Sequence, residues 1–386
     1  MRIAHVITRM IVGGAQENTL FTCEDLIRDH GDEVLLITGP ALGPEGNLLT
    51  GQRGRIVPQS VVPSLRRAIH PVRDLRAYWE IKRQLRDFRP EVVHTHSAKG
   101  GILGRTAAAA LEVPVIVHTV HGAPFHDFQS RGARSFFRLC EKFAARRCHA
   151  LISVADAMTE QLVEADVAPR DKFTTIYSGM DVAPLLNADA ERLATRRELG
   201  FDTDHVVVGK IARLFHLKGH QYLIEAAALA VKDCPRLRFL LIGDGILRAE
   251  LEAKIAEAGL TAYFRFTGLV DPQRIPTLVG AMDALVHCSL REGLARALPQ
   301  ALIAGRPAIS YDIDGAREVI VNGETGYLLP ARSVEPLAEA LVDVASNDQR
   351  RRQMGQIGRE RFTEQFRHEN MTAQIRLLYQ RLVQNR

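Results

Sequence analysis

Short runs of β-branched and other apolar residues alternate along the chain with longer segments in which apolar residues recur at helical spacing. This alternation is typical of βα units around a parallel sheet, whose strands are buried on both faces. A helix is predicted from about Ala15 to His30, and Gly31 is a suitable residue to end it. In the first half of the chain the pattern predicts strands at Ile3–Thr8, Glu33–Thr38, Glu91–Thr95, Val113–Val120, Ala150–Val154 and Phe173–Tyr177.

The same pattern starts again in the second half of the chain. It predicts strands at Val206–Ala212, Phe239–Ile242, Phe264–Thr267, Ala284–His287, Ala308–Tyr311 and Tyr327–Leu329. We therefore expect an α/β protein of two doubly wound units in tandem, joined near Asp181–Leu186. The tail from Ser346 to Arg386 has no strand pattern, but its apolar residues keep helical spacing, so it should pack on another element.

The expected domains are residues 1–180, completed by a C-terminal helix at about 363–386, and residues 181–362. Ligands of doubly wound sheets bind beyond the carboxyl ends of the strands. Two such domains that face each other would direct both sets of strand ends into one interdomain cleft. Candidate chemistry is therefore sought in the loops that follow the predicted strands.

The composition is that of a globular protein and narrows the class of partner. Hydrophobic residues make up 46% and charged residues 25% of the 386 residues, and the formal net charge is +5. So small a positive excess favours anionic small ligands or phospholipids over nucleic acid. The five cysteines form no CxxC pair, which indicates a reducing compartment without a disulfide framework or a zinc site.

The start of the chain and its longest apolar runs bear on localisation. A strand pattern begins at Arg2, so no signal peptide is expected. No apolar run approaches the length of about eighteen residues that a membrane-spanning helix needs. We expect a cytoplasmic protein.

The first candidate site follows the first predicted strand, in the segment Ile11-Val12-Gly13-Gly14-Ala15-Gln16. Two glycines allow backbone amides to approach an anion closely, and the N-terminus of the following helix adds partial positive charge. The alternative interpretation is a tight turn that only needs small residues. The segment lacks the spacing GxGxxG, which argues against a dinucleotide-dependent oxidoreductase.

The second candidate site opens the second domain, where Arg213 ends a predicted strand and Lys218 stands at the start of a helix. A diphosphate leaving group develops negative charge as its bond breaks. Fixed guanidinium and ammonium groups stabilise such charge without a metal. The alternative is a pair of solvated surface cations.

The third and most informative stretch is Ser289–Leu302, which carries Glu292 and Gly293 in a loop before a helix predicted to begin near Arg296. Exposed amides at Gly293, Leu294 and Ala295 would cradle a sugar or a phosphate. Glu292 would accept hydrogen bonds from sugar hydroxyls. The alternative is that Glu292 only caps the helix.

With a glycine loop, then Arg-x4-Lys-Gly, then Glu-Gly-Leu before a helix, the chain resembles the retaining glycosyltransferases of family four, the group 1 glycosyl transferases. The resemblance covers nearly the whole chain, and His94–Arg105, Val117–Gly122 and Asn322–Tyr327 support it. It implies the GT-B architecture, in which two Rossmann-like domains face an interdomain cleft and the C-terminal helix packs back on the N-terminal domain. The N-terminal domain would hold the acceptor and the C-terminal domain the nucleotide-sugar donor.

The resemblance also implies roles for single residues around the donor phosphates. Gly13 and Gly14 would lie beside the donor diphosphate, and Arg213 and Lys218 would hold its phosphates. In family terms the reaction occurs on one face of the sugar, and the departing phosphate oxygen helps to take the acceptor proton. No metal or other cofactor would be required.

The resemblance also assigns residues to the transferred sugar and to the reacting centre. Glu292 would act as a catalytic residue that contacts the sugar, with Gly293, Leu294 and Ala295 nearby. His121, just past a predicted strand, would be the second catalytic residue, close to the reacting centre.

The base and ribose site contains a departure from the family pattern. The backbone around Leu269 and Val270 would hold the base. The family usually has a second glutamate seven residues beyond the first, where this chain has Gln300, and that glutamate generally binds the ribose hydroxyls. Gln300 keeps one acceptor, so weaker donor binding is expected rather than lost chemistry. The usual Asn of an Asn-Gly pair is Ser178 here.

Two metal-binding interpretations are weighed and set aside. Asp312-Ile313-Asp314 matches the DxD of another glycosyltransferase architecture, but no further carboxylate accompanies it at metal spacing. A second set with the ligand type of a zinc site consists of His94, His96, His118 and His121. It lacks an acidic partner at metal spacing, so polar residues lining the cleft are the preferred interpretation.

Two basic segments of the first domain contain aromatic residues. Ser64–Arg89 holds eight Lys or Arg against three acids, and Arg131–Ala150 holds six against one. Basic helices with aromatic residues suit an anionic bilayer surface, and the alternative is a solvated helix face. The first interpretation predicts peripheral association with the inner face of the membrane and makes a lipid-linked acceptor more plausible.

Together these features predict an enzyme that transfers a hexosyl unit from a nucleotide-diphosphate sugar, a UDP-sugar by preference, to a hydroxyl of a glycan, a lipid-linked sugar or a small acceptor. The setting would be polysaccharide or glycolipid assembly. Two alternatives remain open at this point. One is a catalytically weak nucleotide-sugar-binding partner of another transferase, and the other is a UDP-sugar epimerase on the same scaffold.

Overall fold

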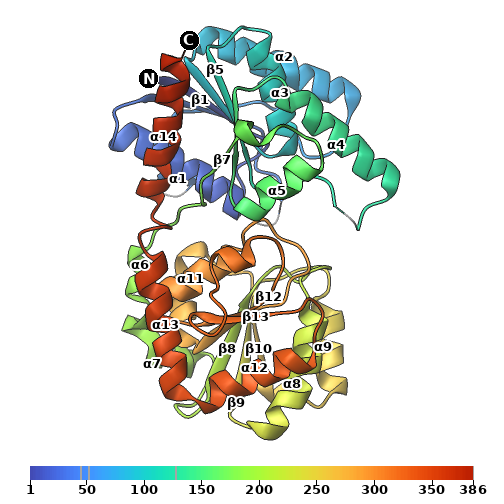
Figure 1. Ribbon diagram of the computed structural model, residues 1–386, viewed down its shortest axis with the longest axis vertical. Coiled ribbons are helices and arrows are strands. Elements are labelled where there is room, and N and C mark those ends of the chain that lie inside the picture. Colours follow the sequence, from blue (N-terminus) through green and yellow to red (C-terminus); the bar gives the residue numbers. More distant parts are fainter. Residues whose placement is uncertain (44–45, 51–52, 127, 386) are drawn as a thin grey trace. The chain divides into compact units, whose positions relative to one another are not determined.

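The computed structural model describes residues 1–43, 46–50, 53–126 and 128–385 (Figure 1). Contacts divide the chain into two compact units, Met1–Met180 with Phe366–Arg386 and Asp181–Gln365. Each unit is one parallel sheet covered by helices, so the predicted α/β class with two doubly wound units is confirmed. Within the described part of the chain, no helix has the length and apolarity needed to cross a membrane.

The N-terminal unit contains a seven-stranded parallel sheet in the order β3-β2-β1-β4-β5-β6-β7. Six of these strands lie where the apolar runs predicted them. The seventh, β3, was missed because it has three residues, two of them polar, and so shows no periodicity. The strands are β1 (Arg2–Ile7), β2 (Glu33–Thr38), β3 (Gln59–Val61), β4 (Val92–His96), β5 (Val115–Val120), β6 (Ala150–Ser153) and β7 (Phe173–Thr175).

Helices cover both faces of this sheet. Ile3 and Ile7 of β1 share a core cluster with residues of α1 and α14, which lie side by side (Figure 1). Side chains alternate between the faces of a strand, and Val6 points instead toward Gly104 of α3. The helices are α1 (Gly14–Arg28), α2 (Pro71–Phe88), α3 (Ala98–Ala109), α4 (Arg131–Ala145), α5 (Asp156–Glu164) and α14 (His368–Gln384).

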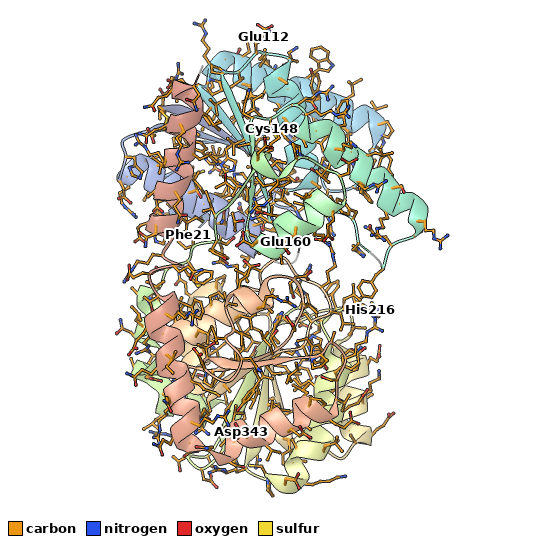
Figure 2. All side chains as sticks on the ribbon, in the orientation of Figure 1. Phe21, Glu112, Cys148, Glu160, His216 and Asp343 are labelled. Carbon is orange, nitrogen blue, oxygen red and sulfur yellow. The ribbon has the colours of Figure 1, made fainter. Side chains whose placement is uncertain are left out.

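The C-terminal helix α14 packs on the N-terminal unit, as predicted. The buried Asp25 of α1 accepts hydrogen bonds from His368 Nδ1 and Thr372 Oγ1, both at 2.8 Å. Phe21 of α1, which is labelled in Figure 2, stacks on the His368 ring with the ring centroids 4.5 Å apart. One turn further along α14, Arg376 Nε donates to Asp32 at 2.8 Å. These contacts attach the end of the chain to its beginning.

The second unit contains a six-stranded parallel sheet in the order β10-β9-β8-β11-β12-β13. All six strands lie at the predicted positions. They are β8 (Val206–Ile211), β9 (Leu237–Ile242), β10 (Phe264–Gly268), β11 (Ala284–His287), β12 (Ala308–Tyr311) and β13 (Gly326–Leu329). The helices are α6 (Ala183–Leu186), α7 (Arg192–Glu198), α8 (His220–Asp233), α9 (Arg248–Glu257), α10 (Ile275–Ala281), α11 (Ala297–Ile303), α12 (Glu335–Ser346) and α13 (Asp348–Phe362).

A glycine lets two loops of this second sheet approach each other closely. Gly219 has φ +68°, and a Cβ there would lie 1.8 Å from the carbonyl oxygen of Cys288. Leu290 N donates to Leu217 O at 2.8 Å beside this contact. The loop after β8 is therefore held against the loop after β11, and this contact positions the candidate site.

Replacing Thr372 by Val tests the attachment of α14. The substitution keeps the side-chain volume but removes one of the donors to the buried Asp25, so we expect a loss of about 1–2 kcal/mol in the free energy of unfolding. Urea unfolding followed by circular dichroism measures it. The control is Thr203→Val at an exposed loop position. Equal urea midpoints for the two variants would show that the contact with Asp25 does not stabilise the unit.

Candidate functional site

In the second unit, the candidate residues lie at the carboxyl edge of the sheet. All neighbouring strands are parallel, so the loops after β8, β11 and β12 emerge at the same edge. The loop after β8 supplies Lys218, the loop after β11 supplies Glu292, and Asp314 follows β12. Residues far apart in the sequence therefore converge here.

The carboxylate of Glu292 is the centre of this group. Lys218 Nζ lies 2.5 Å from Glu292 Oε1, and His287 Nε2 lies 3.2 Å from the same oxygen. The backbone N–H of Glu292 donates to Asp314 Oδ2 at 2.6 Å. The Lys218 and Glu292 side chains are each 20% exposed, so the pair remains accessible to a ligand.

The surroundings keep Glu292 ionised. Burial alone would raise the pKa of Glu292, but the hydrogen bond from His287 and the positive charge of Lys218 outweigh it and hold this pKa well below its usual range. Burial lowers the pKa of His287, which makes the neutral imidazole the relevant donor. Glu292 is therefore suited to accept hydrogen bonds rather than to donate a proton.

Next to Glu292 lie three backbone amides for which the described residues supply no acceptor. Among the described residues, the N–H groups of Gly293, Leu294 and Ala295 donate no hydrogen bond. The carbonyl of Gly293 is engaged, since it accepts from Gly315 N at 3.2 Å. Such amides beside a Lys–Glu pair are available to a ligand rich in oxygen atoms, such as a sugar or a phosphate.

Asp314 orders this loop from the neighbouring strand. Its φ of +46° lies in the left-handed region, which aspartate tolerates better than most residues. Burial raises the pKa of Asp314. Asp312 does not join it but pairs with Arg317, with Nε–Oδ1 and Nη2–Oδ2 distances of 3.0 and 2.9 Å. The two aspartates of the DxD motif are thus engaged with different partners.

The other predicted donor-site residues lie on the same edge but are not joined to Glu292. Arg213 is exposed, and its guanidinium lies 5.0 Å from the centroid of the Phe215 ring. Leu269 and Val270 follow β10, and Leu269 is exposed. Gln300 is half-buried on α11. In the described residues, no hydrogen bond or ion pair connects any of these side chains to Glu292.

The sequence interpretation missed His287 and the turn after β9. His287 ends a predicted strand five residues before Glu292, and that position was the available signal. The turn Gly243-Asp244-Gly245 approaches Arg213 from the side, since Leu214 N donates to Asp244 O at 3.0 Å. A Cβ at Gly243 would lie 2.3 Å from Ala212 O. A second glycine pair after a strand was the signal for this turn.

In the N-terminal unit, the glycine loop precedes α1. Gly13 is the N-cap and has extended backbone, with φ 170° and ψ 159°, and α1 begins at Gly14. A Cβ at Gly13 would lie 2.8 Å from Gln16 Oε1, the movable end of a side chain. Glycine at position 13 therefore leaves space beside the backbone of this loop. It is not needed there for a left-handed conformation.

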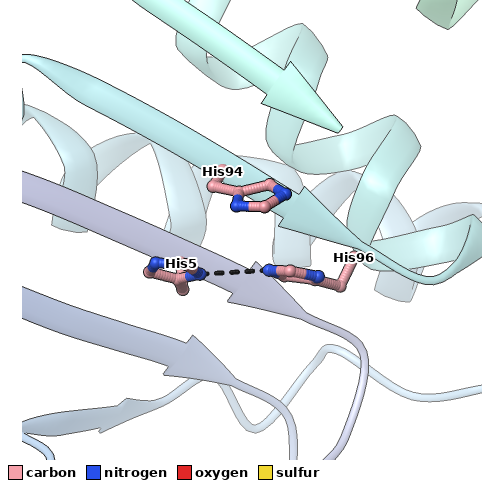
Figure 3. A group of neighbouring side chains, drawn as sticks. All are labelled: His5, His94 and His96. Carbon is pink, nitrogen blue, oxygen red and sulfur yellow. Dashed lines mark hydrogen bonds between the residues drawn. The ribbon is translucent and has the colours of Figure 1, made fainter. Parts of the chain in front are cut away.

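His121 ends a chain of hydrogen-bonded imidazoles. His121 Nε2 lies 3.2 Å from His96 Nδ1, and His96 Nε2 lies 3.0 Å from His5 Nδ1 (Figure 3). His5, His94 and His96 are fully buried, and His121 is half-buried. Burial lowers the pKa of His5 to about 3, and it also lowers the pKa of His96. Neutral rings in such a chain fix which nitrogen of each ring carries the proton.

Three of these histidines have the spacing of a metal site but a different set of contacts. One ring nitrogen from each of His5, His94 and His96 lies within 4.8 Å of the others (Figure 3). Both nitrogens of His94 are already bonded, to Tyr379 Oη at 2.5 Å and to Thr119 Oγ1 at 2.7 Å. A metal bound here would have to displace the hydrogen bonds of His94 and the one between His5 and His96.

Comparison with protein families matches both units. The model described as Glycosyltransferase Family 4 matches residues 12–183, and the model described as Glycosyl transferases group 1 matches residues 191–361. The two matches follow one another along the chain and leave out only its ends and a short segment between them.

Curated relatives and solved structures match over most of their length. A UDP-Gal:alpha-D-GlcNAc-diphosphoundecaprenol alpha-1,3-galactosyltransferase of Escherichia coli is 28% identical over 349 residues, which cover 90% of this chain and 88% of the relative. A 2-deoxystreptamine N-acetyl-D-glucosaminyltransferase of Streptomyces fradiae is 29% identical over 368 residues, covering 88% and 84%. The structure of Anabaena HepE in complex with UDP matches with a TM-score of 0.84, 21% identity and coverage of 99% and 100%.

Replacing Glu292 by Gln tests its electrostatic environment through the pH dependence of stability. A pKa held below the unfolded-state value of about 4.3 stabilises the fold fully above that pH, and the stabilisation is lost as the pH falls toward the folded-state pKa. We expect wild type to melt at a higher temperature than Glu292→Gln at pH 7 and the gap to narrow below about pH 4.3. Scanning calorimetry measures the melting temperatures of both proteins at each pH, and Glu257→Gln at an exposed position is the control. A gap that stays constant down to pH 3 would contradict the assignment.

Proposed function

Since the chain belongs to glycosyltransferase family 4, we propose that it transfers a hexosyl unit from a UDP-sugar to a hydroxyl of a glycan, a lipid-linked sugar or a small acceptor, with retention of the anomeric configuration. The observation that carries this proposal is the Lys218–Glu292–His287 group beside the three unengaged amides of Gly293, Leu294 and Ala295. This edge offers a cation for phosphate and an ionised carboxylate for sugar hydroxyls.

The leaving group sets the first requirement of the reaction. When the bond between the anomeric carbon and the β-phosphate oxygen breaks, negative charge collects on the diphosphate. Lys218 and Arg213 would hold these phosphates, and Gly13 and Gly14 would leave room beside them. Lys218 is paired with Glu292 in the protein alone, and a bound diphosphate would share its three donors with that carboxylate.

The sugar sets the second requirement. Glu292 cannot serve as a general acid at neutral pH, because its pKa lies well below the usual range. Its role would be to accept hydrogen bonds from sugar hydroxyls, next to the amides of Gly293, Leu294 and Ala295. The new bond to the acceptor oxygen would form on the face from which the phosphate leaves, and the acceptor proton would pass to the departing phosphate oxygen.

The proposal requires no metal ion. Two cationic side chains would take the place that a divalent cation has in other transferases. The contacts of Asp312 with Arg317 and of Asp314 with the Glu292 amide support this part, because they engage the two carboxylates with different partners of the protein.

The nucleotide and the acceptor are proposed from the relatives. The Escherichia coli relative is named for UDP-Gal and a diphosphoundecaprenol-linked acceptor, and HepE was solved with UDP. In this chain the backbone at Leu269 and Val270 would hold the uracil base, and Gln300 would bind the ribose. Transfer in the cytoplasm would suit both a free and a membrane-held acceptor.

His121 is proposed as a catalytic residue at the reacting centre. His96 would act on it as a positioning residue, since its Nδ1 lies 3.2 Å from His121 Nε2 and its other nitrogen is bonded to the buried His5. This contact would set the tautomer that His121 presents to a substrate.

Donor binding and stereochemistry test the proposal directly. UDP and UDP-sugars without added metal are expected to raise the melting temperature, because they bind only the folded state. NMR analysis of the transfer product should show the anomeric configuration of the donor, and turnover should continue in EDTA. Turnover that stops in EDTA and returns with Mn²⁺ would overturn the metal-free mechanism. UDP binding without transfer to any acceptor would favour the catalytically weak partner.

Arg213→Ala tests the charge stabilisation of the leaving group. The loss of one transition-state donor should lower kcat by about a hundredfold or more while the melting temperature is unchanged. Arg238→Ala is a matched control, because the Arg238 guanidinium also lies 5.0 Å from an aromatic centroid, that of Tyr263. Arg238 stands near the start of β9, away from the carboxyl ends of the strands. Similar kcat values for the two variants would contradict the proposed role of Arg213 in stabilising the leaving group.

A further inference from the structure

Two helices of the N-terminal unit expose a stripe of large apolar side chains. On α2 the stripe consists of Val72, Leu75 and Trp79, and on α4 it consists of Phe136, Leu139 and Phe143. Both follow the spacing i, i+3, i+7 of one helical face, which is normally buried. These side chains are instead 48% to 74% exposed. Contiguous exposed apolar residues of this size mark an interaction surface.

The α4 stripe reaches a pocket beside α3, on the side of the unit that also carries α2. Helix α3 packs against both α2 and α4, and the three helices lie along one side of the unit (Figure 1). A pocket of about 460 Å³ opens between them, and Phe136 of the α4 stripe lines it together with Ile69, which precedes α2 and is also exposed. We call the stripes and this rim the α2–α4 face. The pocket is also lined by Lys99, Ile102, Leu103 and Phe137.

The α2–α4 face is strongly basic. Ser64–Arg89 has eight Lys or Arg against three acids, and Arg131–Ala150 has six against one. The acid of the second segment, Glu141, is buried and pairs with Arg105 at 2.8 Å, so it adds no negative charge to the surface. In the first segment, Asp74 pairs with Lys99 at 2.7 Å. Lys142 of the second segment is in turn paired with Asp166 outside it, so the net positive charge of the face stays close to the sequence count.

Cations and aromatic rings occur together on this face. Lys82 Nζ lies 5.4 Å from the centroid of the Trp79 ring, and the Arg147 guanidinium lies 3.5 Å from that of Phe143. Long cationic side chains beside apolar ones place charge and hydrocarbon at the same surface. Aromatic residues flanked by Lys and Arg match the boundary between lipid head groups and acyl chains.

We propose that the α2–α4 face binds an anionic lipid bilayer, with the two apolar stripes inserted at the level of the head groups and the surrounding Lys and Arg against lipid phosphates. A second copy of this chain fits the face less well, because it would bring two basic surfaces together. The binding itself is independent of the proposed function. Its use rests on that function, since a pocket that opens at the bilayer surface would give access to a lipid-linked acceptor.

Co-sedimentation of the full-length protein with vesicles tests this proposal. We expect binding to phosphatidylcholine vesicles that contain about a third phosphatidylglycerol, and little binding to phosphatidylcholine alone. Binding should weaken as NaCl rises from 0.05 to 0.5 M, because salt screens the cations. Equal binding to both kinds of vesicle, or no binding to either, would overturn the proposal.

Two sets of substitutions separate the apolar and the cationic contributions. The first is Leu75→Ser/Trp79→Ser/Leu139→Ser/Phe143→Ser, and the second is Arg131→Glu/Arg138→Glu. Each should lower the partition coefficient on anionic vesicles by at least about tenfold. The controls carry two Leu→Ser or two Arg→Glu changes at exposed positions of other helices and should bind as wild type. They are Leu193→Ser/Leu377→Ser and Arg352→Glu/Arg381→Glu.

Two further measurements keep the outcomes distinct. The far-UV circular dichroism spectrum and the urea midpoint should match wild type in all variants, which shows that a loss of vesicle binding is not a loss of fold. The UDP-induced rise in melting temperature should also be unchanged. If the protein binds vesicles but UDP does not raise its melting temperature, the proposed function is overturned and the membrane-binding proposal is kept. If UDP raises the melting temperature but the protein does not bind vesicles, only the membrane-binding proposal is overturned. Sedimentation velocity that shows a dimer dissociated by the stripe substitutions would assign the face to a second copy instead.

Discussion

The ion pair between Lys218 and Glu292 depends on the close approach of two loops that are 74 residues apart in the chain. The approach is limited by backbone atoms, because a Cβ at position 219 would overlap the carbonyl of Cys288. With glycine there, Leu290 can donate to the carbonyl of Leu217 and bring its loop into register. The carboxylate, the cation and the unengaged amides of the loop then share one edge of the sheet.

Partial burial gives this ion pair its chemical character. A carboxylate removed from water would tend to take up a proton, but Lys218 and His287 compensate for the lost hydration. Asp314 holds the backbone of the same residue and thereby limits the directions in which the side chain can point. The site thus consists of the Glu292 carboxylate, which its neighbours keep ionised, and of Asp314 after β12, which fixes the Glu292 backbone.

The N-terminal unit depends on a different set of buried polar contacts. Helix α14 is attached to the unit through Asp25 of α1, Asp32 before β2 and His94 of β4, and each accepts or shares a hydrogen bond with a residue of that helix. Because these contacts need a specific partner at a specific place, they give α14 one position along α1. The same unit leaves the apolar stripes of α2 and α4 exposed, although their spacing is that of a buried face.

The sequence by itself determined the two sheets, because strands buried on both faces need continuous apolar runs and helices need the 3.6-residue period. It also identified Glu292, Lys218 and the loop amides as candidates, through glycines and charges placed just after strands. It missed β3, which is too short to show a period, and His287, which looks like any residue at the end of a strand. Only the tertiary structure decided that Lys218 pairs with Glu292, that Asp314 accepts from the Glu292 amide while Asp312 pairs with Arg317, and which apolar stripes remain exposed. The reason is physical: periodicity reports the average environment of a segment, whereas pairing and exposure depend on which distant residues the fold brings to the same point.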